Sequence, residues 1–148
     1  IQRLLKMGIS GDDLADASNL FMAQRLVRRL CKDCAVEAEP TEKERATIER
    51  VLATLSKSTE ITIPTTLHIF KEKGCPTCNG TGYTGQMILS EALTIDQEMK
   101  ALIASGALAH EIEAAAIKQG MITILQDGVL AMLEGKTTLE EIERVTEI

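Results

Sequence analysis

Apolar and polar positions along the C-terminal third of the chain alternate with the 3.6-residue period of a helix. From Thr94 onward this pattern predicts short helices over Gln97–Ser105, His110–Gln119, Thr123–Glu134 and Leu139–Val145. Glycines stand near their ends, at positions 106, 120 and 135. Because helices this short are marginal in water by themselves, we expect them to pack on one another or on the rest of the protein.

The last of these helices has two further features. Thr138 and Glu141 have the spacing of a capping box, in which each side chain accepts a hydrogen bond from the other residue's backbone. Its acidic residues predict a solvated face. These are Glu140, Glu141, Glu143 and Glu147.

A similar helical pattern covers the first thirty residues. Residues 1–7 predict one helix that ends at Gly8, and Ser10 or Asp12 can cap the next. The pattern predicts that this second helix runs from about Asp13 to Leu30. Its apolar stripe consists of Leu14, Ala17, Leu20, Phe21, Val27 and Leu30.

The C-terminal end of this predicted helix is basic. It carries Arg25, Arg28 and Arg29, and Lys32 follows. Cations there interact favourably with the helix dipole, which is one explanation for them. The other is an interface with an acidic neighbour or with nucleotide phosphates, for which the three arginines are the candidate residues.

The middle of the chain mixes helical and extended patterns. Thr41 and Glu44 form a capping box before a predicted helix of about 16 residues. Runs rich in β-branched and aromatic residues then predict strands at Ile61–Ile63 and Leu67–Phe70, and a further strand at Met87–Leu93. The predicted fold class is therefore α+β, mainly helical.

Composition narrows the functional classes. Aromatic residues make up 2% of the 148 residues and the net charge is −6, so neither base stacking nor attraction to a phosphate backbone favours nucleic-acid binding. No apolar run approaches a membrane span. The sequence shows no signal peptide and has only four cysteines, so we expect a soluble, cytoplasmic protein with reduced thiols.

All four cysteines occur in two Cys-x-x-Cys pairs, Cys31/Cys34 and Cys75/Cys78. Two such pairs supply the four thiolates of a tetrahedral structural zinc site, and four protein ligands leave no open position for catalysis. Glycines at 80, 82 and 85 permit the positive φ angles of a backbone that curls around a metal. Two disulfides, four ordinary thiols and a redox Cys-x-x-Cys site are the alternatives.

Other motifs are incomplete. Gly135-Lys136-Thr137 matches the tail of a phosphate-binding loop, but Leu130 stands where the first glycine belongs, and the tripeptide follows a helical pattern instead of a strand. We interpret His68 and His110 as surface or half-buried residues, because the four cysteines already complete the ligand set of a zinc ion.

Three segments, in order, resemble the hexameric ATPases of type II secretion and type IV pilus assembly. They are Ala23–Cys31, Gly74–Tyr83, and the set Gly120-Met121, Asp127-Gly128 and Gly135–Glu141. The resemblance implies the C-terminal part of such an ATPase. Residues 1–30 would end a RecA-like motor domain, residues 31–90 would form a tetracysteine zinc-binding subdomain, and residues 91–148 a closing helical subdomain.

In that family the P-loop and the Mg²⁺-binding acidic motifs lie upstream, so the resemblance implies that they precede Ile1 in a longer parent protein. ATP and Mg²⁺ would be bound by the parent, and this part alone should not hydrolyse ATP. The implied partners are the other subunits of a homohexamer and an inner-membrane platform protein. The implied location is cytoplasmic, peripheral to the inner membrane, in a machine for protein transport or filament assembly.

One stretch departs from the family pattern. After Gly85 the family usually continues with Arg and a small, Gly-containing step before an acidic residue, whereas Gln86–Ser90 precedes Glu91 here.

Two other classes of protein remain open. Cys75-x-x-Cys78-x-Gly80-x-Gly82 is also the repeat unit of DnaJ-type cysteine-rich domains, although only one unit of four is present, and a zinc-ribbon adaptor needs no more than the four cysteines.

Overall fold

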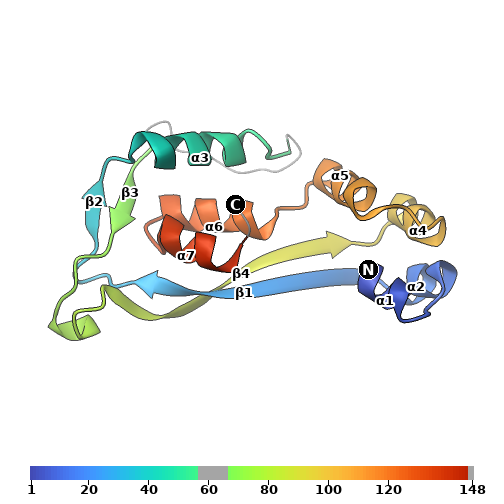
Figure 1. The fold of residues 1–148 in the computed structure, drawn as a ribbon, viewed down its shortest axis with the longest axis horizontal. Coiled ribbons are helices and arrows are strands. Elements are labelled where there is room, and N and C mark those ends of the chain that lie inside the picture. The colour runs from blue at the N-terminus through green and yellow to red at the C-terminus, as the bar shows by residue number, and fades with distance from the viewer. Residues whose placement is uncertain (57–66, 147–148) are drawn as a thin grey trace.

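A long antiparallel ribbon of two strands forms the spine of the molecule, as a computed structural model shows for residues 1–56 and 67–146 (Figure 1). The strands are β1 (Leu20–Leu30) and β4 (Tyr83–Thr94). Leu20 lies opposite Thr94 and Arg28 opposite Gln86, and the register then shifts before Leu30 pairs with Tyr83. The fold is α+β, as the sequence predicted, and most of the elements along the described parts are helices.

The prediction of a helix from Asp13 to Leu30 is wrong. The structure has a short helix, α2 (Gly11–Ala17), capped by Ser10, and then strand β1. The residues of β1 include Leu, Met, Ala, Gln and Arg, which favour helices intrinsically. Pairing with β4, which lies about sixty residues away in the sequence, overrides that local preference. The three arginines therefore lie on a strand and not at a helix terminus.

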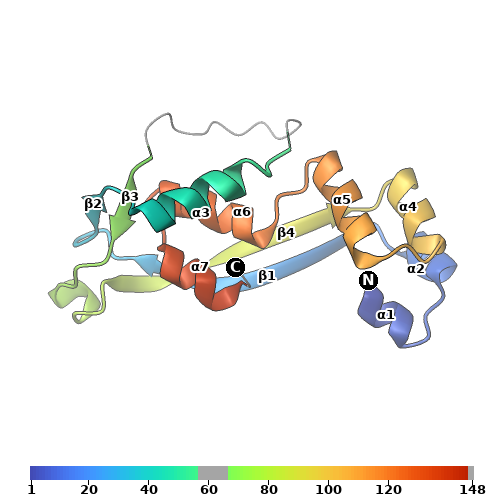
Figure 2. The same cartoon turned by 45° about the horizontal axis from the view of Figure 1, so that its top comes forward.

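One end of the ribbon carries a first hydrophobic core between four helices (Figures 1 and 2). These helices are α1 (Gln2–Lys6), α2, α4 (Gln97–Ala104) and α5 (Ala109–Gln119). Met99, Ile103 and Ala116 are completely buried there, and Leu93 and Ile95 join them from the end of β4 and the residue after it. The predicted helix over residues 1–7 is confirmed, as are the two predicted helices near 97–105 and 110–119.

A second core lies on the other half of the ribbon, beneath α6 (Ile124–Leu133), α7 (Leu139–Val145) and α3 (Glu42–Leu52) (Figure 2). Its buried side chains come from all three helices and from both long strands. They include Val27, Ile48, Leu89, Val129 and Ile142, none of which is accessible to solvent. The last two predicted helices are thereby confirmed, and α3 is shorter than the predicted length.

A small two-stranded sheet closes this end of the molecule. Strand β3 (Ile69–Lys71) overlaps the strand predicted at Leu67–Phe70 and pairs with β2 (Val36–Ala38), which the sequence pattern did not predict. The strand predicted at Ile61–Ile63 lies outside the described residues. Between the two cysteine pairs the chain thus forms β2, α3 and β3 in turn.

The capping residues behave differently in the two predicted boxes. Thr41 and Glu44 form the complete box, with Glu44 Oε2 accepting from the Thr41 backbone N–H at 2.7 Å. Thr138 caps α7, but Glu141 does not return a bond to it. Glu141 is also buried, contrary to the solvated face expected for this helix, whereas Glu140 and Glu143 are exposed.

Candidate metal centre

The four cysteines converge at the far end of the ribbon from the first core (Figure 1). Cys31 directly follows β1 and Cys34 lies three residues later, whereas Cys75 precedes a short 3₁₀ turn (Pro76–Cys78) and Cys78 ends it. All four Sγ atoms lie within 4.8 Å of one another. The Cys31–Cys75 and Cys34–Cys78 sulfur distances are 3.8 Å, and Cys75–Cys78 is 3.7 Å.

These distances match a tetrahedral tetrathiolate site. With metal–sulfur bonds of about 2.3 Å, the edge of a regular tetrahedron of sulfurs is about 3.8 Å. A disulfide requires about 2.0 Å, and all four cysteines are free thiols. Three of the four side chains are buried and Cys75 is partly exposed. The donor set and its spacing fit a zinc ion with four protein ligands.

Backbone amides point at one of the sulfurs. The N–H groups of Cys75 and Gly82 donate to Cys78 Sγ at 3.1 and 3.2 Å. Burial disfavours the Cys78 thiolate, but these hydrogen bonds outweigh burial and lower the pKa of Cys78 to about 6. Burial instead dominates at Cys34, where it raises the pKa of the thiol to about 12. Cys78 therefore loses its proton more readily than Cys34.

The second Cys-x-x-Cys turn depends on a glycine just before it. Gly74 has φ +89°, and a Cβ atom there would lie 2.6 Å from the carbonyl oxygen of Gly80. A side chain at this position would therefore both strain the backbone and push apart the two ends of the turn. The predicted positive φ angles at 80, 82 and 85 are confirmed. Cys31 N–H donates to Gly82 O at 2.9 Å, which ties the first cysteine pair to the second.

The three arginines singled out from the sequence have separate environments. Arg28 donates to buried Glu141 through both its guanidinium, at 2.7 Å, and its backbone N–H, at 2.9 Å. Arg25 is exposed and donates to Gln24 O at 3.0 Å. Arg29 is half-buried beside Lys32 and Lys136. The arginines therefore do not converge on one site.

Sequence reasoning missed the network around Glu141. This carboxylate also accepts from Arg144, at 2.8 and 3.2 Å, and its side chain is only 2% exposed. The Arg28 guanidinium stacks 4.1 Å above the Tyr83 ring, whose hydroxyl lies 3.0 Å from Thr138 Oγ1. The network fastens α7 to β1 and to the start of β4. Burial and the bonds to Arg28 and Arg144 set Glu141 apart from Glu140 and Glu143, and no local sequence signal predicts them.

The incomplete phosphate-loop motif has a structural role. Thr137 is fully buried and its hydroxyl donates to Arg28 O at 2.9 Å, while Lys136 pairs with Glu134. The hydroxyl and ammonium that would contact Mg²⁺ and phosphate in a working loop are thus used within the protein. The histidines lie away from the cysteines: His68 Nδ1 is 3.1 Å from Glu37 Oε1, and His110 is exposed on α5.

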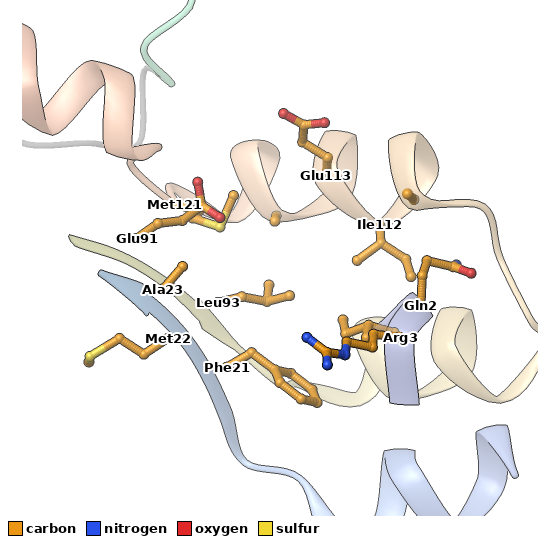
Figure 3. A pocket seen from close by; sticks show the side chains of 13 residues that line it. Gln2, Arg3, Phe21, Met22, Ala23, Glu91, Leu93, Ile112, Glu113 and Met121 are labelled. Atoms are coloured by element: carbon orange, nitrogen blue, oxygen red, sulfur yellow. The ribbon is translucent and has the colours of Figure 1, made fainter. Parts of the chain in front are cut away.

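A separate hollow of about 590 Å³ opens between α1, α5 and the ends of the long strands. Phe21, Leu93 and Ile112 form apolar walls, and Arg3 points its guanidinium across the opening (Figure 3). Glu113 projects away from it (Figure 3). Its 13 lining residues bring together no nucleophile and base, so this hollow offers no catalytic set.

Within the part of the chain that the structure describes, no helix combines the length and the hydropathy needed to cross a membrane.

Comparison with known proteins identifies relatives over nearly the whole chain. The profile of the family described as "Type II/IV secretion system protein" matches residues 1–144. A type IV pilus assembly ATPase, PilB, of Thermus thermophilus is 38% identical over 142 residues, which cover 96% of this chain and 15% of the relative.

Two further relatives carry secretion names. The type II secretion system protein HxcR of Pseudomonas aeruginosa is 34% identical over 99% of this chain and 25% of its own length. The type II secretion system protein E of Aeromonas hydrophila is 36% identical over 99% of this chain and 27% of its own length. The chain thus spans between 15% and 27% of the length of these three relatives.

Proposed function

This chain belongs to the type II/IV secretion system protein family, and on that basis we propose that it is the C-terminal, zinc-binding portion of a hexameric ATPase. The parent protein powers pilus or pseudopilus assembly, or protein secretion. Its other partners are an inner-membrane platform protein and the remaining subunits of the hexamer, and it works on the cytoplasmic side of that membrane. The match over residues 1–144 favours this function over a DnaJ-like or adaptor-type zinc module.

The observation that carries the zinc-binding part of the proposal is the cluster of four sulfurs. Cys31, Cys34, Cys75 and Cys78 hold one structural Zn²⁺, because their spacing fits a closed tetrahedral site with no position for water or substrate. The metal joins the end of β1 to the start of β4 and closes the loop that contains β2, α3 and β3. Its role is structural: it fixes a lobe through which motion can be passed on.

The remaining parts take the roles that the family implies. Residues 1–30 end the RecA-like motor domain, residues 31–90 form the zinc-binding subdomain, and residues 91–148 form the closing helical subdomain. ATP and Mg²⁺ bind elsewhere in the parent, and the internal hydrogen bond of Thr137 supports this, since its hydroxyl is engaged by Arg28 O.

The test uses the parent protein with Cys75→Ser, and Ser105→Ala, just after α4, as a control. We expect the cysteine variant to lose zinc and filament or secretion output in cells, while the purified parent still hydrolyses ATP. The control should retain all three properties. Unchanged output without zinc, or ATP turnover by residues 1–148 alone, would contradict the proposal.

A further inference from the structure

Three cations surround one hollow beside the metal centre. The hollow has a volume of about 370 Å³ and lies where the end of β1 meets the α6–α7 loop. Arg29, Lys32 and Lys136 line it, together with one carboxylate, Glu134. Leu30, Ala35 and Phe70 supply apolar surface. On a chain of net charge −6, this is a local concentration of positive charge.

The backbone holds Lys136 beside Arg29 and Lys32, although Lys136 lies about a hundred residues later in the sequence. Leu30 N–H donates to Lys136 O at 2.9 Å, which fastens the end of β1 to the α6–α7 loop. Gly135 has φ +72°, and a Cβ atom there would lie 2.8 Å from the Phe70 ring. The loop that carries Lys136 therefore lies directly against the apolar side of the hollow, and its position is fixed by packing.

The positive charges are only partly balanced. Lys136 pairs with Glu134. Arg29, which is half-buried, and Lys32 have no acidic partner among residues 1–56 and 67–146. Their N–H groups are therefore available to an anion, and hydrogen bonds between charged groups are stronger than those to neutral acceptors. The hollow therefore fits an anionic ligand.

The backbone favours a carboxylate over a phosphate group as that ligand. Phosphate sites usually present free backbone N–H groups. Here the N–H groups of Leu30, Ala35, Gly135 and Lys136 all donate to carbonyls within the protein. The apolar surface of Phe70 suits the aliphatic part of an acidic peptide.

We propose that this basic hollow binds an acidic peptide segment of a partner protein, with carboxylates on Arg29 and Lys32 and an apolar side chain against Phe70. The proposal rests on the hollow and its charges and does not require the ATPase function. It adds a protein-binding site next to, and separate from, the four cysteines.

The test measures binding of a fluorescein-labelled Glu-Glu-Leu-Glu-Glu peptide by fluorescence anisotropy at constant ionic strength. The test variant is Arg29→Gln with Lys32→Gln, and the control is Arg3→Gln with Lys6→Gln on α1, which removes the same charge at the other end of the molecule. We expect the test variant to weaken binding about tenfold or more and the control to change it less than about twofold. In ¹⁵N spectra of the unaltered chain, the peptide should shift the amides of Ala35 and Gly135.

Equal weakening in both variants would show non-specific attraction and overturn the proposal, as would peptide binding that leaves Ala35 and Gly135 unshifted. Inorganic phosphate and phosphatidylglycerol vesicles serve as competitors. If either displaced the peptide at a lower anion concentration than free glutamate did, the hollow would be a phosphate or lipid site instead. Thermal unfolding monitored by circular dichroism verifies that both variants are folded.

Discussion

Replacement of Glu141 by glutamine tests the network that holds α7 on the ribbon. The carboxylate accepts four hydrogen bonds: two from Arg144, one from the Arg28 guanidinium and one from the Arg28 backbone N–H. A glutamine at this position would lack the negative charge, and its amide NH₂ would face groups that can only donate. The substitution therefore leaves donors of the network without an acceptor and two cations without their shared partner.

The magnitude follows from the geometry. Burial opposes ionisation of Glu141, but the bonds from Arg144 and Arg28 outweigh it and lower the pKa from 4.5 to about 2, which corresponds to roughly 3 kcal/mol. Because the side chains of Arg28 and Arg144 are 49% and 52% exposed, solvent screens part of this. We expect Glu141→Gln to reduce the free energy of unfolding by roughly 1–3 kcal/mol.

Urea unfolding provides the assay, followed by circular dichroism and by the fluorescence of Tyr83, the one tyrosine in a chain without tryptophan. Glu140→Gln is the matched control, because Glu140 lies on the same helix and is exposed. We expect this control to change stability by less than about 0.5 kcal/mol. If the two variants were equally stable, the Glu141 network would not hold α7 in place and the reasoning would be refuted.

The remaining predictions concern pH and the metal site. Because the pKa of Glu141 is lower in the folded state, the stability that its carboxylate contributes is complete above about pH 4.5 and is lost as the pH falls toward 2. Glu141→Gln should therefore flatten the pH dependence of the free energy of unfolding between these two pH values. An unchanged slope would contradict this prediction. Removal of the metal by a chelator, or by Cys75→Ser, should accelerate amide hydrogen exchange in β2 and β3 earlier than in helices α4–α7, because metal binding supplies folding energy. Earlier exchange in α4–α7 would count against the proposed subdomain boundaries. Gly74→Ala should weaken zinc binding about tenfold or more, because the added Cβ would meet the carbonyl oxygen of Gly80. Gly106 has a similar positive φ but open space around it, so Gly106→Ala should leave zinc affinity unchanged. A competitive chelator titration measures both.

The sequence predicted best what depends on local pattern. The four C-terminal helices, the Thr41–Glu44 box and the helix before Gly8 all rest on periodicity and capping within a few residues, and the structure has them. The spacing of the cysteines likewise predicted one cluster, because a Cys-x-x-Cys turn positions its own pair and the metal needs both pairs.

What failed depends on contacts between distant segments. The apolar positions fit the period of a helix, so the pattern by itself does not predict a strand. They are Leu14, Leu20, Phe21, Val27 and Leu30. Pairing with β4 makes Leu20–Leu30 a strand. In the sequence, Glu141 is indistinguishable from the surface carboxylates beside it. Its contact with Arg28 of β1, which is 113 residues earlier in the chain, becomes visible only in the structure. The cations around the basic hollow are also brought together by long-range contacts, among them the bond between Leu30 N–H and Lys136 O.

The central claim is that Cys31, Cys34, Cys75 and Cys78 bind one structural zinc. X-ray absorption at the zinc K edge, on chain purified without added metal, tests it most directly. We expect one zinc per chain with four sulfur ligands at about 2.3 Å and no oxygen or nitrogen ligand. A chain without zinc, or a set of metal ligands that contains oxygen or nitrogen, would contradict it.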